Sequence, residues 1–142
     1  MRASPACLVI DTNVLISAAI LPSSTSAVLL RRASLHYRIA QSQQTWDELV
    51  SRIERPKFDA YFGRRGRSAF LTLLAKSVVV LGDAENVRAS RDPDDDKFLG
   101  LALSCGAKFV VSGDKDLLSL GAFAGVQILN VRSFLTDVCP TD

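Results

Sequence analysis

Six aspartates lie within residues 90–117, beside one of the most apolar stretches of the chain. They are Asp92, Asp94, Asp95, Asp96, Asp114 and Asp116. Carboxylates within about 4–6 Å of one another raise each other's pKa, and a divalent cation removes that penalty. A site that contains only oxygen ligands, without His or Cys, favours Mg²⁺ or Mn²⁺ over zinc. Such an ion commonly serves the hydrolysis of phosphate esters.

Asp11 interrupts the end of an apolar run, in the stretch LVIDTN. An aspartate there is a good N-cap for a helix that begins near Val14. Thr12 or Asn13 could cap that helix equally well, without an acid at the end of a buried strand. The position therefore favours a functional site over a cap.

Glu48 has two interpretations that its spacing leaves open. Thr45 and Glu48 match a capping box, which requires no chemistry. If Ser42 caps the helix instead, Glu48 falls in the second turn and is free to face the end of the sheet.

The segment RDPDDDKF is typical of a helix start. Asp92 suits the N-cap and Pro93 the first helical position, while Asp94 and Asp95 suit the dipole of the first turn. Asp96 comes too late to gain much from the helix end and shares a stripe with apolar residues further on. The helix is apolar nearly all round, so this geometry only leans towards Asp96 as a site residue.

Asp114 and Asp116 lie in a tight turn after the apolar run KFVVS. One of them suits the N-cap of a short helix. The turn contains a second acid, and Asp11 is expected at the same end of the sheet. Together these acids indicate a site.

The elements that must position these acids alternate between strands and helices. Strands are predicted at 6–11, 36–42, 78–81, 108–112 and 126–130. Helices are predicted at 12–21, 26–34, 43–53, from Lys57 to about Ala75 with a Gly/Arg loop in between, 94–105, 115–120 and 132–138. The alternation predicts a parallel sheet covered on both faces. Sites in such sheets form beyond the carboxyl ends of the strands, where all the acids above would meet.

The overall composition indicates one globular domain over residues 1–142. Hydrophobic residues make up 48% and charged residues 23% of the chain. No window has 18 uncharged apolar residues, and the start has no signal-peptide pattern, so we expect a cytoplasmic protein. Three cysteines at wide spacing do not suggest zinc or a disulfide framework, and His36, the single histidine, is expected at a surface or strand edge.

Charge is unevenly distributed although the net charge is only +2. Residues 31–76 contain ten Lys/Arg and four acids, whereas residues 77–142 contain six Lys/Arg and ten acids. The first half is therefore expected to offer a basic surface and the second an acidic one.

Four motifs in order resemble those of PIN-domain ribonucleases, in particular VapC-like toxins of type II toxin–antitoxin systems. They are LVIDTNVLISA, ELVSRIERPKF, DPDDDKFLGLAL and FVVSGDKDLL. The resemblance covers nearly the whole chain. It implies an α/β/α sandwich with a parallel sheet of order 3-2-1-4-5 and Mg²⁺- or Mn²⁺-dependent cleavage of RNA.

The resemblance also implies roles for individual residues. Asp11, Glu48, Asp96 and Asp114 would be the catalytic, metal-binding acids, and Asn13, Ser112 and Asp116 would support them. Ser112 stands where the family commonly has Thr, and the hydroxyl is kept. The resemblance thereby favours Asp96 within its aspartate run.

An RNA substrate would need cations, and the basic stretch offers them. The expected phosphate contacts are Arg52, Arg55, Lys57, Arg64, Arg65 and Arg67, with FGRRGR as a flexible basic loop. The family also implies a cognate antitoxin and a homodimer.

Two rival functions stay open. A haloacid-dehalogenase-like phosphatase also begins with an Asp after its first strand, but it needs a second Asp at the position of Asn13. The second rival is a module that binds RNA or an antitoxin without catalysis. The intact set of acids argues against this rival.

Overall fold

A parallel sheet forms the centre of the structure, a computed structural model that describes residues 6–82 and 92–141. Its order is β3-β2-β1-β4-β6-β5, and all pairings are parallel except that between β5 and β6. The strands are β1 (Cys7–Ile10), β2 (Arg38–Ser42), β3 (Val78–Leu81), β4 (Phe109–Val111), β5 (Ala122–Phe123) and β6 (Val126–Leu129). The five parallel strands follow the predicted order 3-2-1-4-5, with β6 as the fifth.

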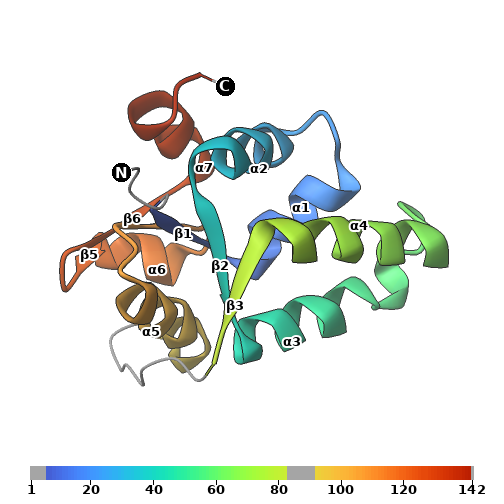
Figure 1. Cartoon of the computed structure of the whole chain (residues 1–142), viewed down its shortest axis with the longest axis horizontal. Coiled ribbons are helices and arrows are strands. Elements are labelled where there is room, and N and C mark those ends of the chain that lie inside the picture. The colour runs from blue at the N-terminus through green and yellow to red at the C-terminus, as the bar shows by residue number, and fades with distance from the viewer. Residues whose placement is uncertain (1–5, 83–91, 142) are drawn as a thin grey trace, which may run out of the picture.

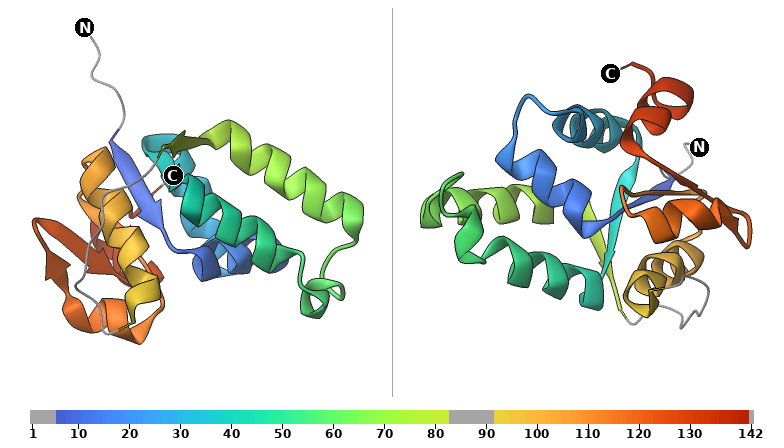
Figure 2. Two further views of the ribbon diagram at one scale, coloured as in Figure 1. Left: turned by 90° about the horizontal axis from the view of Figure 1, so that it is seen from below. Right: turned by 180° about the vertical axis from the view of Figure 1, so that it is seen from behind.

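Helices cover both faces of this sheet (Figure 1). They are α1 (Thr12–Ile20), α2 (Thr25–His36), α3 (Gln43–Ile53), α4 (Arg64–Ser77), α5 (Asp96–Cys105), α6 (Lys115–Leu120) and α7 (Val131–Ser133). Two short 3₁₀ helices, η1 (Pro56–Phe58) and η2 (Pro93–Asp95), and one short π-helix, η3 (Phe134–Val138), are also present. Figure 2 shows α5 on one side of the sheet and α3 and α4 on the other, which makes three layers.

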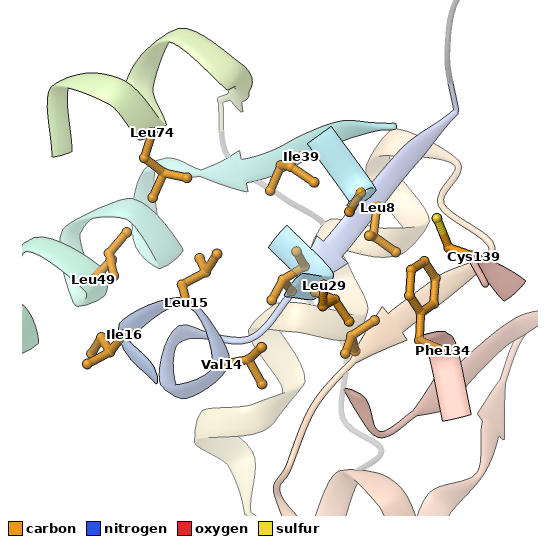
Figure 3. Packing of buried hydrophobic residues seen from close by; sticks show 13 residues of the cluster. Leu8, Val14, Leu15, Ile16, Leu29, Ile39, Leu49, Leu74, Phe134 and Cys139 are labelled. Atoms are coloured by element: carbon orange, nitrogen blue, oxygen red, sulfur yellow. The ribbon is translucent and has the colours of Figure 1, made fainter. Parts of the chain in front are cut away.

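Alternation along the strands produces two hydrophobic cores. Leu8 and Ile10 of β1 pack with α1, α2, α3 and α4 on one face (Figure 3), whereas Val9 packs with α5 and α6 on the other. In β2, Ile39 packs in the first of these cores and Ala40 in the second. Because both faces are covered, β1 and β4 are apolar throughout, and acids follow each of them beyond its carboxyl end.

The edge strand β5 was not predicted. It joins β6 through a two-residue turn in which Ala124 and Gly125 both have positive φ, 50° and 86°. That geometry belongs to a type I′ hairpin, for which Asn-Gly is the usual signal. Ala-Gly lacks that signal, so the sequence did not reveal the hairpin.

The predicted basic loop FGRRGR is wrong, because Arg64 begins α4 and Gly66 lies inside it. A Cβ on Gly66 would come within 2.8 Å of the Phe62 Cβ, so this glycine allows close packing rather than a loop. The predicted helix before it is reduced to the single turn η1. His36 ends α2 and is exposed, so β2 begins two residues later than predicted.

No single helix in the described ranges has both the length and the apolar character needed to cross a bilayer. Among the described residues, α1 and α2 are the one helix pair that together reaches that length and composition, and they are bent by 107°.

Candidate functional site

The carboxyl ends of β1, β2 and β4 each lead into a helix whose first residues are polar. Asp11 follows β1, Ser42 ends β2 and Asp114 comes shortly after β4. Since these strands are parallel neighbours, the three turns meet at one end of the sheet. The site is built there.

Asp11 caps α1 and also lies at this end of the sheet. Its Oδ1 accepts the backbone N–H of Val14 at 2.9 Å, and its Oδ2 accepts the hydroxyl of Ser112. The side chain is buried, with the residue only 5% exposed. Burial raises the pKa of the Asp11 carboxyl; the bonds from Ser112, Val14 and Gly113 oppose this, and the charge of Asp114 adds to it.

Glu48 faces the same end of the sheet because Ser42 caps α3. Ser42 accepts the backbone N–H of Thr45 at 3.1 Å, and Thr45 Oγ1 accepts the N–H of Ser42 at 2.9 Å. This reciprocal pair places Glu48 in the second turn, the alternative in which it is free for the site. Its Oε1 accepts the Thr12 hydroxyl at 2.6 Å, and its Oε2 pairs with Lys97.

Asp92 caps the turn η2, as predicted, accepting the N–H of Asp94 at 3.0 Å with Pro93 next to it. The turn brings Asp95, which is 8% exposed, into the site. Asp95 Oδ2 is buried and has no hydrogen-bond partner among the described residues. Burial raises the pKa of the Asp95 carboxyl to about 7, and the charge of Asp114 is the next cause.

Asp114 caps α6, accepting the N–H groups of Asp116 and Leu117 at 2.8 and 3.3 Å. Its own N–H donates to Ser112 Oγ at 2.9 Å, which links it to Asp11. Carboxylate oxygens of Asp95, Asp114 and Asp116 all lie within 4.8 Å of one another. Three oxygen donors so close, one of them unsatisfied, could hold a hard divalent ion.

A small hollow joins most of these groups, and we call it the acidic hollow. Its volume is about 20 Å³, close to the size of one water-sized occupant. It is lined by Asp11, Thr12, Asn13, Glu48, Arg52, Asp94, Asp95, Phe98 and Asp114. A wider groove of about 510 Å³ shares Asn13 and Asp114 with it and also includes Asp116. The hollow therefore opens beside a space large enough for part of a substrate.

Among the predicted acids, Asp11, Glu48 and Asp114 line this hollow, and Asp116 lies beside them. Asp96 is buried at the start of α5, but it does not line the hollow and is outside the close carboxylate group. Its neighbour Asp95 lines the hollow and belongs to the close carboxylate group. Asn13 reaches the hollow, where its Oδ1 accepts a bond from Arg52 at 3.1 Å.

Lys97 is a site residue that the sequence interpretation missed. It is 8% exposed, and its ammonium contacts Glu48 and, at 2.8 Å, Asp94. A cation in the first turn of a helix opposes the helix dipole, so it needs acidic partners. That mismatch, a lysine directly after DDD in a helix start, is the signal that could have revealed it.

The predicted RNA contacts fall into two groups. Arg52 lines the hollow and approaches Glu48 and Asp94 at 3.5 and 3.6 Å. Arg67 donates to the carbonyls of Ile53 and Arg55 and pairs with Asp59, so it holds the α3–α4 connection together. Arg55, Lys57 and Arg65 are exposed, and the side chain of Arg64 is outside the described part.

Comparison with known proteins places the chain in a family. Residues 7–116 match the PIN domain. Uncharacterized protein MJ1680 of Methanocaldococcus jannaschii is 33% identical over 118 residues, which cover 80% of this chain and 74% of that protein.

Two crystal structures share the fold. A chain of VapBC2 from Rickettsia felis, bound to a DNA fragment from its promoter, superposes with a TM-score of 0.61 at 11% identity and covers 87% of this chain and 98% of its own. PAE2754 from Pyrobaculum aerophilum gives 0.57 at 19% identity, over 96% of this chain and 91% of its own. These structures share the fold, and the sequence match over residues 7–116 shows that the chain belongs to the PIN domain family.

Proposed function

We propose that this protein is a metal-dependent endoribonuclease. The observation that carries the proposal is the group of Asp95, Asp114 and Asp116, whose carboxylate oxygens lie within 4.8 Å of one another and include a buried oxygen without a partner. Carboxylates so close repel one another unless one of them is protonated or a cation neutralises them. PIN domains are typically nucleases, which gives this chemistry a substrate class.

The ion would be Mg²⁺ or Mn²⁺, because all the donors are carboxylate oxygens. Asp95, Asp114 and Asp116 would hold it, with Asp11 beside them. We assign the third acid of the family to Asp95 on the geometry, and keep Asp96, favoured by the resemblance, as the alternative to be tested. When bound, such an ion neutralises phosphate oxygens and lowers the pKa of a water that it carries.

The chain's own residues would position the reacting groups. Thr12 and Lys97 hold both oxygens of Glu48, which fixes that carboxylate at the hollow where it can accept a proton from the attacking water. Ser112 orients Asp11 in the same way, and its hydroxyl also accepts the Asp114 N–H. Asn13 and Arg52 lie at the edge of the hollow, where Arg52 could contact a phosphate. Most of the rate would come from this positioning and from charge neutralisation.

The test is RNA cleavage by the purified protein. Mg²⁺ or Mn²⁺ should support cleavage of a labelled single-stranded RNA, EDTA should stop it, and Asp114→Asn should abolish it. Asp137→Asn, an exposed acid at the far end of the chain, is the matched control and should cut normally. Cleavage that persists in Asp114→Asn with EDTA would refute the proposal. Hydrolysis of p-nitrophenyl phosphate without RNA cleavage would favour a phosphatase instead.

We also propose that the protein acts in the cytoplasm as the toxin of a toxin–antitoxin pair and forms a homodimer. The support for a protein partner is an apolar groove of about 250 Å³ between α2 and α4 that includes Leu30, Phe70 and Leu73. Leu73 is 66% exposed, so its apolar side chain is open to a partner at this groove. A chain of the VapBC2 structure, which is bound to a DNA fragment from its promoter, shares the fold of this chain.

Induced expression tests the toxin role. Growth should stop on induction of the wild-type chain, continue with Asp114→Asn, and recover when a neighbouring small reading frame is expressed with it. Normal growth at a high level of active wild-type protein would contradict the role. Analytical ultracentrifugation of the purified protein decides between monomer and dimer.

A further inference from the structure

The charges around the acidic hollow divide into two halves. On one half, Glu48 and Asp94 each face two cations. Lys97 Nζ contacts Glu48 Oε2 and lies 2.8 Å from Asp94 Oδ1. Arg52 Nη2 lies 3.5 Å from Glu48 and 3.6 Å from Asp94. This half is neutralised by the protein itself.

The other half has no such cations. Within residues 6–82 and 92–141, no ion pair joins Asp11, Asp95, Asp114 or Asp116 to a lysine or arginine. Asp95 is only 8% exposed, and its buried Oδ2 has no hydrogen-bond partner among the described residues. An unsatisfied buried carboxylate oxygen is costly and points to a ligand at this half alone.

Burying the Lys97 ammonium in the first turn of α5 costs free energy unless acidic partners offset it. Its side chain is only 5% exposed, and it lies in the first turn of α5, where the helix dipole disfavours a cation. Removing an ammonium from water is also unfavourable unless it is paired. The contacts with Glu48 and Asp94 compensate both costs and fix the ammonium beside the hollow.

We propose that the Lys97 ammonium occupies the place that a second divalent ion would take. In two-metal sites the ions lie about 3.5–4 Å apart and share the surrounding carboxylates. Here the ammonium would repel a second ion near Glu48. The chain therefore binds one divalent ion, at Asp95, Asp114 and Asp116, and Glu48 is held by Lys97 and is not a metal ligand. This inference rests on the metal site of the proposed function, and not on its RNA substrate.

Counting bound Mn²⁺ tests the inference, by calorimetric titration together with the loss of the free-ion paramagnetic resonance signal. The wild type should bind one Mn²⁺ per chain. Lys97→Gln removes the charge and should bind a second Mn²⁺, whereas Lys97→Arg keeps the charge and should bind one. Two ions in the wild type, or a single ion in a folded Lys97→Gln, would overturn the inference.

A second comparison remains decisive if Lys97→Gln does not fold. Glu48→Gln should change the Mn²⁺ affinity of the wild-type site by less than about fivefold, because Glu48 does not touch the ion. Asp95→Asn should lower it by at least about tenfold. Equal losses in the two variants would make Glu48 a metal ligand and overturn the assignment.

RNA cleavage separates this inference from the proposed function. One Mn²⁺ in the wild type and two in Lys97→Gln, without any RNA cleavage, would uphold the role of Lys97 and refute the nuclease. Two Mn²⁺ in a wild type that cuts RNA would refute the role of Lys97 and uphold the nuclease.

Discussion

At the scale of single residues, the choice between Asp95 and Asp96 shows what spacing can and cannot decide. The apolar stripe of an ideal helix leaned towards Asp96, and the family resemblance favoured it. The structure places the turn η2 over Pro93–Asp95, ahead of α5. The stripe that begins at Asp96 lies wholly within α5 and fits the burial of Asp96, but it does not describe η2, the turn that carries Asp95 into the hollow. Asp95 is thereby the residue that reaches Asp114.

Metal affinity distinguishes the two aspartates. Asp95→Asn should weaken Mn²⁺ binding by at least about tenfold, because it replaces an oxygen of the close carboxylate group. Asp96→Asn should weaken it far less, since Asp96 does not line the hollow. Calorimetry on both variants checks this, with circular dichroism to confirm that each is folded. The opposite order would restore Asp96 as the ligand.

The raised pKa of Asp95 predicts how stability depends on pH without metal. An aspartate in the unfolded chain has a pKa of about 3.9, whereas the folded pKa is about 7. The folded state therefore holds a proton that the unfolded state has lost. The contribution of Asp95 is fully present below the unfolded value, falls as pH rises and is gone above about 7.

Urea unfolding in EDTA measures this effect, and Asp95→Asn isolates it from the other acids. The free energy of unfolding of the wild type, relative to Asp95→Asn, should fall by a few kcal/mol between about pH 4 and pH 7. A difference that stays flat or rises would show that the Asp95 carboxyl is ionised in the folded protein.

At the scale of elements, the sequence predicted the five parallel strands and most helices because buried strands and capped helices leave clear patterns. Asp11 directly follows β1, Ser42 ends β2 and Asp114 comes shortly after β4, and each of them caps the next helix. Tertiary effects escaped prediction. Gly66 reads as a loop residue but allows contact with Phe62 within a helix, and the partners of Lys97 come from α3 and from η2.

The cap of α3 connects local structure to the site. Ser42→Ala should lower the free energy of unfolding by about 1–2 kcal/mol, because the buried N–H of Thr45 loses its acceptor. Ser34→Ala is the control, because Ser34 is exposed and its hydroxyl donates only to the Leu30 carbonyl of its own helix. It should cost less than about 0.5 kcal/mol. Thermal melts of both variants test this, and equal effects would argue against the cap.

At the scale of the whole molecule, the acids gather at one end of the sheet while exposed cations lie on the connection between α3 and α4 and on the first turn of α4. The exposed positions there include Arg55, Lys57 and Arg65. Arg67, in contrast, is engaged with backbone carbonyls and Asp59, so its loss should destabilise the fold as well as any RNA complex.

Salt dependence tests whether the exposed cations contact RNA. In an Asp114→Asn background, replacing Arg55, Lys57 and Arg65 with Ala should weaken single-stranded RNA binding and reduce the slope of log affinity against log salt by about 2. Lys108→Ala is the control, because Lys108 is exposed and precedes β4 at the opposite end of that strand. An unchanged slope in the triple variant would remove these residues from the RNA interface.

The central claim is that carboxylates far apart in the sequence meet at one end of the sheet to hold a hard divalent ion. A crystal structure with Mn²⁺, examined by anomalous diffraction, tests it most directly. The account predicts one anomalous peak in contact with Asp95, Asp114 and Asp116. A crystal saturated with Mn²⁺ that shows no peak there, or a peak held by Asp96 instead, would contradict it.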